Sequence, residues 1–404
     1  MTAVVIFWVS LAMTAWVYAG YPLVLLLIGH LAPRPRRRGN LMLPVSIIVP
    51  AHNEEAVIES KIANLRALDY ASDYMEIIVA SDGSSDRTVE LALRAGAHSV
   101  LDLPRIGKIS ALNRAVRGAK GEILVFTDAD SLLFRETLRE LISNFADAQV
   151  GCVAANEINH VNTDDGPVAR GEGMYWRYEQ WIKRLEARIG STVSASGRLY
   201  AIRRDLFHES GQKAGTDDFL ISTEVVKSGY RLVFDEHARV MVVSGDDARV
   251  EIRRKVRVMN RGIRAAMTLG VDLWRLGGSF YPMQLFSHKI LRRFTGFLLM
   301  ALLLSTAWLA LVDAVWWLVL APQLLFYSLA VAGALLNGSR WSRSKIISVP
   351  YFFCLANWAA TLAVLSWLGG ARFETWEPIR PPRRPALRSE RSWPAQDQQL
   401  SKKR

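Results

Sequence analysis

The N-terminal segment constrains the fold most, because residues 3–31 contain no Lys, Arg, Asp or Glu. An apolar stretch of this length can cross a bilayer as a tilted helix. It lacks a positive leading region and exceeds the apolar core of a secretory signal peptide, so we expect a retained anchor. The basic segment 33–38 that follows predicts a cytoplasmic carboxyl end for this helix and an N-terminus outside.

Three further apolar runs lie late in the chain, at about 294–312, 314–336 and 346–369. Between them and the first run, residues 40–270 have the composition of a soluble domain. We therefore expect a multi-pass protein of the plasma or inner membrane, with these parts: an N-terminal transmembrane helix (1–32), a cytoplasmic domain (41–265), interfacial helices (266–293), C-terminal transmembrane helices (294–370) and a basic, disordered tail (371–404). Three late spans would place the basic tail outside, against the charge rule, so either one run is re-entrant or interfacial or the tail tolerates that side.

The net charge of +12, from 50 Lys and Arg against 38 Asp and Glu, argues for membrane lipids rather than nucleic acid as the anionic partner. The basic residues gather beside the apolar runs, at 36–38, 289–293 and 340–345, where anionic headgroups attract them. Cys152 and Cys354 offer neither a disulfide framework nor a metal site, which is typical of a reducing compartment.

Apolar strands alternate with helices from about residue 45. The expected strands are 45–49, 75–80, 99–103 and 123–126, and the helices begin near Glu54, after a Ser84-Ser85-Asp86 cap, and at Lys108. Uninterrupted apolar strands in this order predict an α/β fold, with a mostly parallel sheet covered by helices on both faces. Ligands of such sheets bind beyond the carboxyl ends of the strands.

Polar residues follow each of these strands. After the fourth strand, Asp128 and Asp130 form an Asp-x-Asp pair, which can hold a divalent cation that in turn holds a diphosphate. Asp82 can accept hydrogen bonds from a uracil imide or a ribose, and Lys108 can place a charge beside a phosphate. Each cluster alone also fits a solvated turn or a helix cap, and capping is the better interpretation of Asp86. Four such clusters on successive strands are hard to explain as caps.

The order of these clusters resembles family 2 glycosyltransferases. The motifs that carry the likeness are 50–55 (PAHNEE), 81–86 (SDGSSD), 107–113 (GKISALN) and 127–130 (TDAD), and the likeness covers about 41–265. It implies the nucleotide-sugar-binding GT-A fold, a divalent cation (Mg²⁺ or Mn²⁺) and inversion at the anomeric carbon. The membrane layout is similar to that of synthases of cellulose, hyaluronan, chitin oligosaccharide and poly-N-acetylglucosamine.

The resemblance also implies roles for individual residues. Residues 196–204 look like the family's acceptor-side loop, and 215–218 like its acidic pair, whose second member is the catalytic base. The implied sets are Ala51, Asn53, Glu54, Asp82, Lys108, Asp128, Arg254 and Arg257 for the donor, Gly197 and Asp217 for the acceptor, Asp130 for the metal, and Asp218 as the base. The chemistry agrees, because inversion needs one carboxylate to deprotonate the acceptor and a separate electrophile for the leaving diphosphate. The bland alternative is that Asp217 and Asp218 only begin a helix.

Aromatic residues give a further acceptor candidate. Trp181, on a helix with Tyr175, Trp176 and Tyr178, could stack on a sugar, although packing is the commoner role of such residues. Farther on, the aromatic and basic residues between Trp274 and Arg293 suit a helix in the membrane interface.

One departure from the family concerns its Gln-x-x-Arg-Trp motif. The matching stretch is 254–258 (RKVRV), in which Arg254 replaces Gln and Val258 replaces Trp, while Arg257 keeps the phosphate-facing charge. This departure argues against long-chain polymerisation and leaves transfer to a lipid-linked or short acceptor open. The basic residues 253–257 also fit a helix on lipid headgroups.

The function implied by the resemblance is a membrane-bound, inverting transfer of a sugar from a UDP-sugar, with N-acetylglucosamine as the expected sugar. The acceptor would be a polysaccharide or a lipid-linked carbohydrate, with export subunits as candidate partners. Two other readings remain: a nucleotidyltransferase on a similar sheet, which needs no acidic pair at 217–218, and a non-enzymatic scaffold or export partner.

Overall fold

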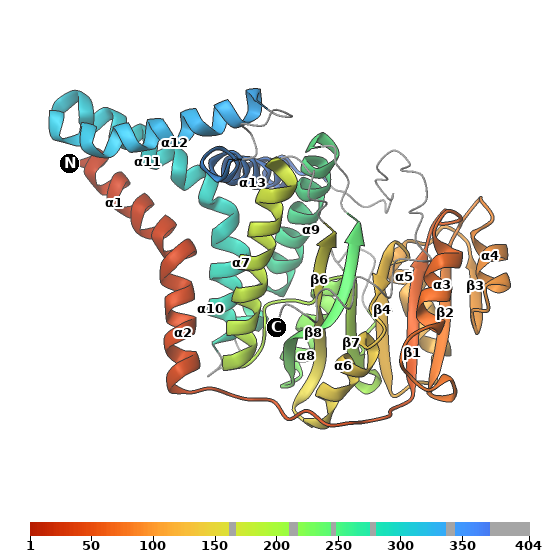
Figure 1. Ribbon diagram of the computed structural model, residues 1–404. Coiled ribbons are helices and arrows are strands. Elements are labelled where there is room, and N and C mark those ends of the chain that lie inside the picture. Colours follow the sequence, from red (N-terminus) through yellow and green to blue (C-terminus); the bar gives the residue numbers. More distant parts are fainter. Residues whose placement is uncertain (161–166, 210–216, 244–247, 275–279, 337–343, 372–404) are drawn as a thin grey trace.

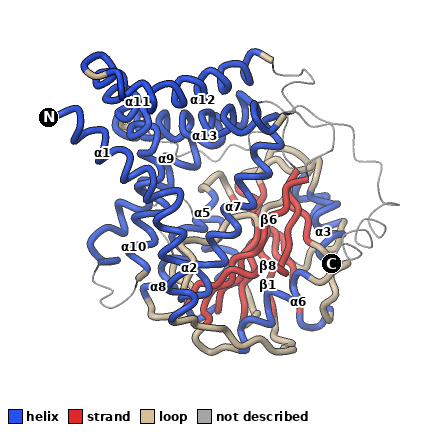
Figure 2. The backbone as a smooth tube through the Cα atoms, turned by 60° about the vertical axis from the view of Figure 1, so that its left-hand side comes forward, coloured by secondary structure: helices blue, strands red, loops and turns tan. Residues whose placement is uncertain are grey.

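The computed structural model describes residues 1–160, 167–209, 217–243, 248–274, 280–336 and 344–371. A single mixed sheet with helices on both faces stands beside a group of long apolar helices (Figures 1 and 2). The expected α/β class is therefore confirmed. The tail at 372–404, as well as Gly215 and Thr216 before the acidic pair, lies outside the described residues.

The sheet has eight strands in the order β3-β2-β1-β4-β7-β6-β8-β5. The strands are β1 (Val45–Ala51), β2 (Met75–Asp82), β3 (Ser99–Leu103), β4 (Ile123–Thr127), β5 (Ser131–Leu133), β6 (Val150–His160), β7 (Leu199–Arg203) and β8 (Arg231–Val243). The first four are parallel, as the sequence predicts. The other half is mixed, because β7 runs antiparallel to both β4 and β6, and β5 antiparallel to β8. Since β1, β2, β3 and β4 share a direction, the loops after them meet at one edge.

Helices bury the sheet from both sides, as Figure 2 shows. One apolar cluster joins the sheet to α3 (Ile58–Arg66), α4 (Thr88–Arg94) and α6 (Thr137–Ser143). A second cluster joins the other face to α5 (Lys108–Gly118), α7 (Pro167–Ile189), α8 (Asp217–Lys227), α9 (Ala248–Trp274) and α10 (Tyr281–Leu285). Within β1, Ile47 faces the first cluster and Ile48 the second, as the two-residue period of a strand requires. The helix after β1 begins at Ile58, not near Glu54, because residues 54–57 form a turn.

In the part of the chain that the structure describes, four helical segments are long and apolar enough to cross a membrane: Thr2–Leu31, Tyr281–Val312, Ala314–Leu335 and Lys345–Leu368. They contain α1 (Thr2–Ala15), α2 (Tyr21–Leu31), α11 (Thr295–Val312), α12 (Trp317–Leu335) and α13 (Lys345–Leu368). Many of their large apolar side chains are exposed, which is expected of surfaces that meet lipid. These segments indicate a membrane protein. The second segment begins at Tyr281, so part of the predicted interfacial region belongs to a candidate span.

A buried polar network joins α2 and α7 to the start of the second span. His288 lies between two carboxylates, with Nε2 2.9 Å from Glu179 and Nδ1 2.7 Å from Glu186. The Tyr21 hydroxyl also donates to Glu186, and the other oxygen of this carboxylate accepts from the Thr192 hydroxyl at 2.8 Å. The network therefore links two membrane segments to the loop that leads toward Gly197.

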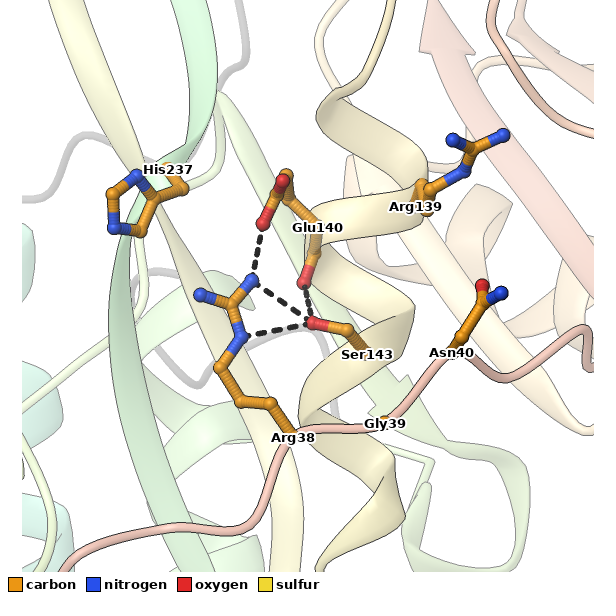
Figure 3. Close-up of a pocket in the computed structure, with 7 residues that line it drawn as sticks. All are labelled: Arg38, Gly39, Asn40, Arg139, Glu140, Ser143 and His237. Atoms are coloured by element: carbon orange, nitrogen blue, oxygen red, sulfur yellow. Dashed lines mark hydrogen bonds and ion pairs between the residues drawn. The ribbon is translucent and has the colours of Figure 1, made fainter.

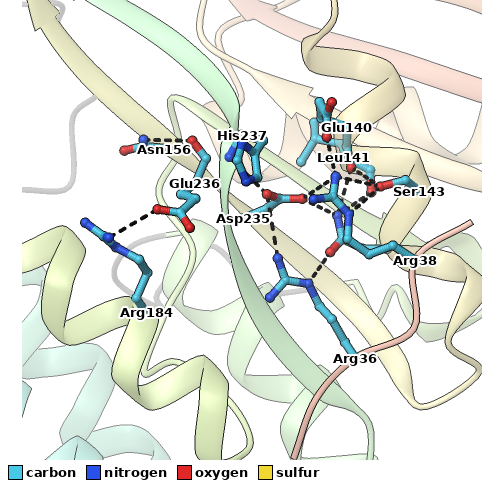
Figure 4. Close-up of polar contacts among 11 residues, drawn as sticks. Arg36, Arg38, Glu140, Leu141, Ser143, Asn156, Arg184, Asp235, Glu236 and His237 are labelled. Atoms are coloured by element: carbon cyan, nitrogen blue, oxygen red, sulfur yellow. Dashed lines mark hydrogen bonds and ion pairs between the residues drawn. The ribbon is translucent and has the colours of Figure 1, made fainter. Parts of the chain in front are cut away.

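The basic linker after α2 runs along one end of the sheet before it enters β1 (Figure 1). Two of its arginines bind the domain that contains the sheet and not lipid headgroups as expected: Arg36 and Arg38 lie 3.6 and 3.3 Å from the carboxylate of Asp235 (Figure 4). Asp235 is fully buried and also accepts a hydrogen bond from Asn144 at 2.6 Å. A buried carboxylate needs such partners, and this need explains the difference.

A shallow cavity of about 470 Å³ opens where this linker crosses α6 (Figure 3). Its lining consists of Arg38, Gly39, Asn40, Arg139, Glu140, Ser143 and His237. None of these is a predicted site residue, and the Arg38 guanidinium in it is already bonded to Glu140 and Ser143. The cavity is part of the seam between linker and domain.

Candidate functional site

The loop after β2 centres on Asp82, whose side chain is buried. Its Oδ1 accepts hydrogen bonds from the backbone N–H groups of Ile106 at 2.7 Å and Gly107 at 2.9 Å, in the loop after β3. Its Oδ2 lies 3.7 Å from an Arg105 nitrogen and has no hydrogen-bond partner within the described residues. A buried acceptor left without a donor is costly, so this oxygen is suited to accept from a bound ligand.

The loops after β1 and β2 are fastened together by Asn53. This residue has a positive φ of 54°, and its side-chain oxygen accepts a hydrogen bond from Ser85 N at 2.8 Å. Its own N–H donates to the Ser84 hydroxyl at 3.1 Å. The side chain of Asn53 therefore shapes the loop. Ala51 ends β1 and has no exposed surface.

The next two residues of the two loops are joined in the same way. The Glu54 N–H donates to the Thr88 hydroxyl at 2.7 Å, which fixes the turn after β1 to the start of α4. Asp86 caps α4 through Thr88 N at 3.0 Å, as its capping interpretation predicts. Gly83 has φ +64°, and a Cβ there would lie 2.8 Å from Arg105 N, so the loops after β2 and β3 approach at a position that only glycine fits.

Side chains from three separate segments meet around Gly197. Lys108 Nζ lies 3.0 Å from Asp128 Oδ1 and 3.1 Å from Asp217 Oδ2, and Gly197 N donates to Asp218 Oδ2 at 2.9 Å. A Cβ on Gly197 would stand 3.6 Å from Lys108 Nζ, 3.8 Å from Asp128 Oδ2 and 3.9 Å from Asp218 Cγ. The glycine therefore leaves open the space that these charged groups face.

The two neighbouring acids have opposite pKa shifts. The pKa of Asp218 is raised to about 6, first by burial and then by the negative charge of Asp217, while Lys108 opposes the rise. Burial also acts to raise the pKa of Asp217, but the charges of Lys108 and Arg261 outweigh it and hold this pKa below its ordinary value. Acids whose environments separate their pKa values in this way can take different parts in one reaction.

The Asp-x-Asp turn presents its second acid to solvent. The side chain of Asp130 is 56% exposed and that of Asp128 26% exposed. Arg198, in the loop beside Gly197, binds Asp130 through Nη1 at 2.5 Å. The turn and the acceptor-side loop thus touch at two points, through Arg198 and around Gly197.

Comparison with known proteins matches residues 46–211 to the family model of glycosyl transferase family 2. This range contains the motifs that directly follow β1, β2 and β3, and it also contains the Asp-x-Asp turn after β4. The chain carries a family 2 glycosyltransferase domain.

The relatives of this domain include makers of a polysaccharide and of a glycolipid. Poly-beta-1,6-N-acetyl-D-glucosamine synthase of Staphylococcus aureus is 27% identical over 200 residues, which are 47% of this chain and 48% of the synthase. Beta-monoglucosyldiacylglycerol synthase of Trichormus variabilis is 29% identical over 205 residues, or 47% of this chain and 44% of that protein. The chain thus matches about half the length of these relatives.

The fold has a solved counterpart in a mannosyltransferase, PcManGT, from Pyrobaculum calidifontis, determined with GDP-Man and Mn²⁺. It is 24% identical, and the superposition covers 91% of this chain and all of the other, with a TM-score of 0.66. The GT-A expectation for the glycosyltransferase domain is therefore confirmed at the level of the fold.

A divalent cation fits the acids of the glycosyltransferase domain. The described residues contain no group of three or more His, Cys, Asp and Glu side chains that could hold a metal alone. Asp128 and Asp130 offer one or two carboxylates, which is the share that a protein supplies to Mg²⁺ or Mn²⁺ when phosphate oxygens and water complete the shell.

One predicted acceptor residue, Trp181, lies apart from this centre, whereas the roles of Arg254 and Arg257 stay predictions. Trp181 packs with Tyr178 against an apolar cluster that includes Tyr21 and Leu25 of α2, so the structure uses it for packing, the commoner role of such residues. Arg254 and Arg257 lie on α9, where the neighbouring Lys255 places its ammonium 5.0 Å from the centre of the Phe352 ring. The side chain of Trp274 lies outside the described residues.

Three functional candidates are missing from the sequence-based set: Lys61, Arg198 and Arg261. Arg198 lies inside the acceptor-side motif, but nothing in the sequence indicates its ion pair with Asp130. Arg261 follows Arg257 by one helical turn on α9 and acts on Asp217. Lys61 had a readable signal, because it is a charged residue on the apolar face that Ile58, Ile62 and Leu65 give to α3.

Proposed function

We propose that the protein is a membrane-bound, metal-dependent, inverting glycosyltransferase that uses a UDP-sugar on the cytoplasmic face. The domain would span about 41–265. The observation that carries this proposal is the meeting of Asp218, Asp217, Lys108 and Asp128 around Gly197. It sets a carboxylate of raised pKa beside the turn that family members use for a diphosphate.

The donor half of the site fits a uridine diphosphate. Asp82 Oδ2, buried and without a donor, would accept the imide N–H of uracil. Lys108 would turn from Asp128 toward a phosphate oxygen, because its ammonium already lies among the acids that flank the diphosphate. A cation held by Asp130, with Asp128 beside it, would supply positive charge to the leaving diphosphate.

The acceptor half places Asp218 as the base. The backbone N–H groups of Gly197 and Phe219 orient the carboxylate, which would take the proton of an acceptor hydroxyl. With a pKa of about 6, Asp218 is mostly ionised near neutral pH yet basic enough to take a proton in the transition state. Attack from the face opposite the diphosphate then inverts the anomeric carbon.

The acceptor would be a polysaccharide or a lipid-linked carbohydrate. The apolar spans beside the domain support access from the membrane. The names of the relatives support both product classes, a poly-N-acetylglucosamine and a glucosyl lipid, and favour N-acetylglucosamine or glucose as the sugar. The absence of Gln and Trp from 254–258 favours a short product.

The test offers purified full-length protein a panel of UDP-sugars, with GDP-mannose as a comparison, in Mn²⁺ or Mg²⁺. Nucleotide release and product mass are measured. We expect release from one UDP-sugar, and we expect Asp218→Asn to abolish transfer while UDP still binds. Full activity of Asp218→Asn would favour the nucleotidyltransferase alternative. Release from no donor would favour the non-enzymatic scaffold.

A further inference from the structure

Lys61 carries a charge into the interior of the domain. It lies on α3, and its side chain has no exposed surface. Burial lowers the pKa of Lys61 to about 7, while the negative charges of Asp128 and Asp130 act to raise it. Lysine is seldom buried in this way without a specific task, because an ammonium loses its hydration on burial.

The hydrogen bonds of this ammonium are complete. Its three N–H donors meet three acceptors: the Thr127 hydroxyl at 2.8 Å, the Ser131 carbonyl at 2.6 Å and the Ser131 hydroxyl at 3.2 Å. Thr127 and Ser131 are the residues immediately before and after the segment 128–130. Lys61 therefore closes the base of the Asp-x-Asp turn.

The hydroxyls of Thr127 and Ser131 connect Lys61 to further backbone groups. The Thr127 hydroxyl, accepting from Lys61, donates to the carbonyl of Arg198 at 2.9 Å. The Ser131 hydroxyl donates to the Asp128 carbonyl at 2.8 Å. Each hydroxyl thus both accepts and donates, and the two hydroxyl oxygens lie 3.0 Å from each other, so the network joins both ends of the turn to Arg198. Arg198 follows Gly197, whose N–H holds Asp218.

A second contact of α3 offers a matched control. One turn after Lys61, the Asn64 side chain donates to the Leu133 carbonyl at 2.8 Å and accepts from Leu133 N at 2.9 Å. Asn64 therefore holds the same short strand, β5, but two residues farther from the turn. Neither of these bonds reaches Thr127, Asp128 or Arg198, so a change at Asn64 separates anchoring of the strand from positioning of the turn.

We propose that Lys61 is a positioning residue that fixes the Asp-x-Asp turn and the Gly197-Arg198 loop in one register, so that the metal-binding carboxylate and the base are set relative to each other. The inference rests on the proposed function for the roles of Asp130 and Asp218. The contacts themselves do not depend on it. Lys61 touches neither donor nor acceptor in this scheme.

The test compares Lys61→Met, which keeps the length and removes the donors, with Lys61→Gln, which keeps two N–H donors without charge. Hydrogen exchange of the full-length protein in detergent reads the two loops without any ligand. We expect amides at 127–131 and 196–199 to exchange about tenfold faster in Lys61→Met. Lys61→Gln should recover part of this protection, and Asn64→Leu should affect mainly the amides near Leu133.

The functional consequence is read by titrating UDP in the presence of Mn²⁺. We expect Lys61→Met to weaken binding about tenfold to a hundredfold, the usual range for residues that orient metal ligands. Loss of a nearby positive charge alone would strengthen cation binding, so the direction separates positioning from charge. If Lys61→Met does not fold, Ser131→Ala takes its place, and a smaller loss of protection at 196–199 is expected.

Unchanged exchange in both loops, or tighter Mn²⁺·UDP binding by Lys61→Met, would overturn the role of Lys61. Failure of the unaltered protein to bind UDP with Mn²⁺ would instead count against the proposed donor. In that case the exchange experiment would still decide whether Lys61 holds the two loops together.

Discussion

The opposite pKa shifts of Asp217 and Asp218 predict how transfer depends on pH. Asp218 must be ionised to act as a base, and its pKa is about 6. The ionised fraction should therefore be about 91% at pH 7 and about 9% at pH 5, so kcat/KM should fall about tenfold between these values. A surface aspartate would give almost no fall in this range, because its pKa lies near 4.

Two substitutions should move the midpoint of this fall in kcat/KM to opposite sides of pH 6. Asp217→Asn removes the negative charge that raises the pKa of Asp218, so the midpoint should move below 6. Lys108→Gln removes the positive charge that lowers this pKa, so the midpoint should move above 6. Both variants should also lower the maximal rate, since Lys108 and Asp217 belong to the site, but the shift in midpoint does not depend on that loss.

The assay is nucleotide release by purified protein at low donor concentration, where kcat/KM reports the pKa values of the free enzyme. UDP binding measured at the same pH values separates loss of the base from loss of the donor complex. If the midpoint of the fall in kcat/KM stays at the same pH in both variants, Asp218 is not the group whose ionisation causes the fall. The same conclusion would follow from an upward shift in Asp217→Asn.

Two further predictions concern residues outside the acidic pair. Asp82→Asn can keep both backbone hydrogen bonds of Oδ1 while an amide N–H₂ replaces the unpartnered oxygen, so UDP binding should weaken about tenfold to a hundredfold in calorimetry with little change in Tm. Asp235→Asn should lower the free energy of unfolding by about 1–3 kcal/mol in thermal melts, because it weakens the buried anchor of the linker. The neighbouring Glu236→Gln, which breaks only an exposed pair with Arg184, should cost less than about 1 kcal/mol (Figure 4). Equal losses in these two variants would contradict this account of the linker.

The parallel half of the sheet was readable from the sequence because each of its strands is an apolar run that ends in a turn motif. The bounds of β3 were predicted as found, and β1, β2 and β4 differ only at their carboxyl ends. The mixed half was not readable. Leu199–Arg203 was identified only as part of a loop motif, yet it inserts between β4 and β6. Its pairing depends on partners far away in the chain, which local periodicity does not encode.

The same limit applies to the charged residues. Arg36 and Arg38 follow an apolar run, and this position in the sequence predicts contact with lipid headgroups. In the structure both form ion pairs with Asp235, about two hundred residues away in the sequence. Arg198 was visible in its motif, whereas its pairing with Asp130 was not. Composition predicts where charge accumulates along the chain, and only the fold determines which opposite charge or lipid meets it.

The acidic pair shows why a site needs more than its residue types. Asp217 and Asp218 are chemically identical neighbours at the start of one helix, and both are buried. Asp217 bonds directly to Lys108 and also feels the charge of Arg261, whereas Asp218 accepts backbone hydrogen bonds from Phe219 and Gly197 and lies beside the negative charge of Asp217. A direct cation stabilises the ionised form more than backbone N–H groups do, so the paired acid stays ionised and its neighbour becomes the basic one. The functional asymmetry of the pair therefore depends on how the fold places Lys108 and the Gly197 loop around the two aspartates, and an exchange of Lys108 should narrow it without a change in either aspartate.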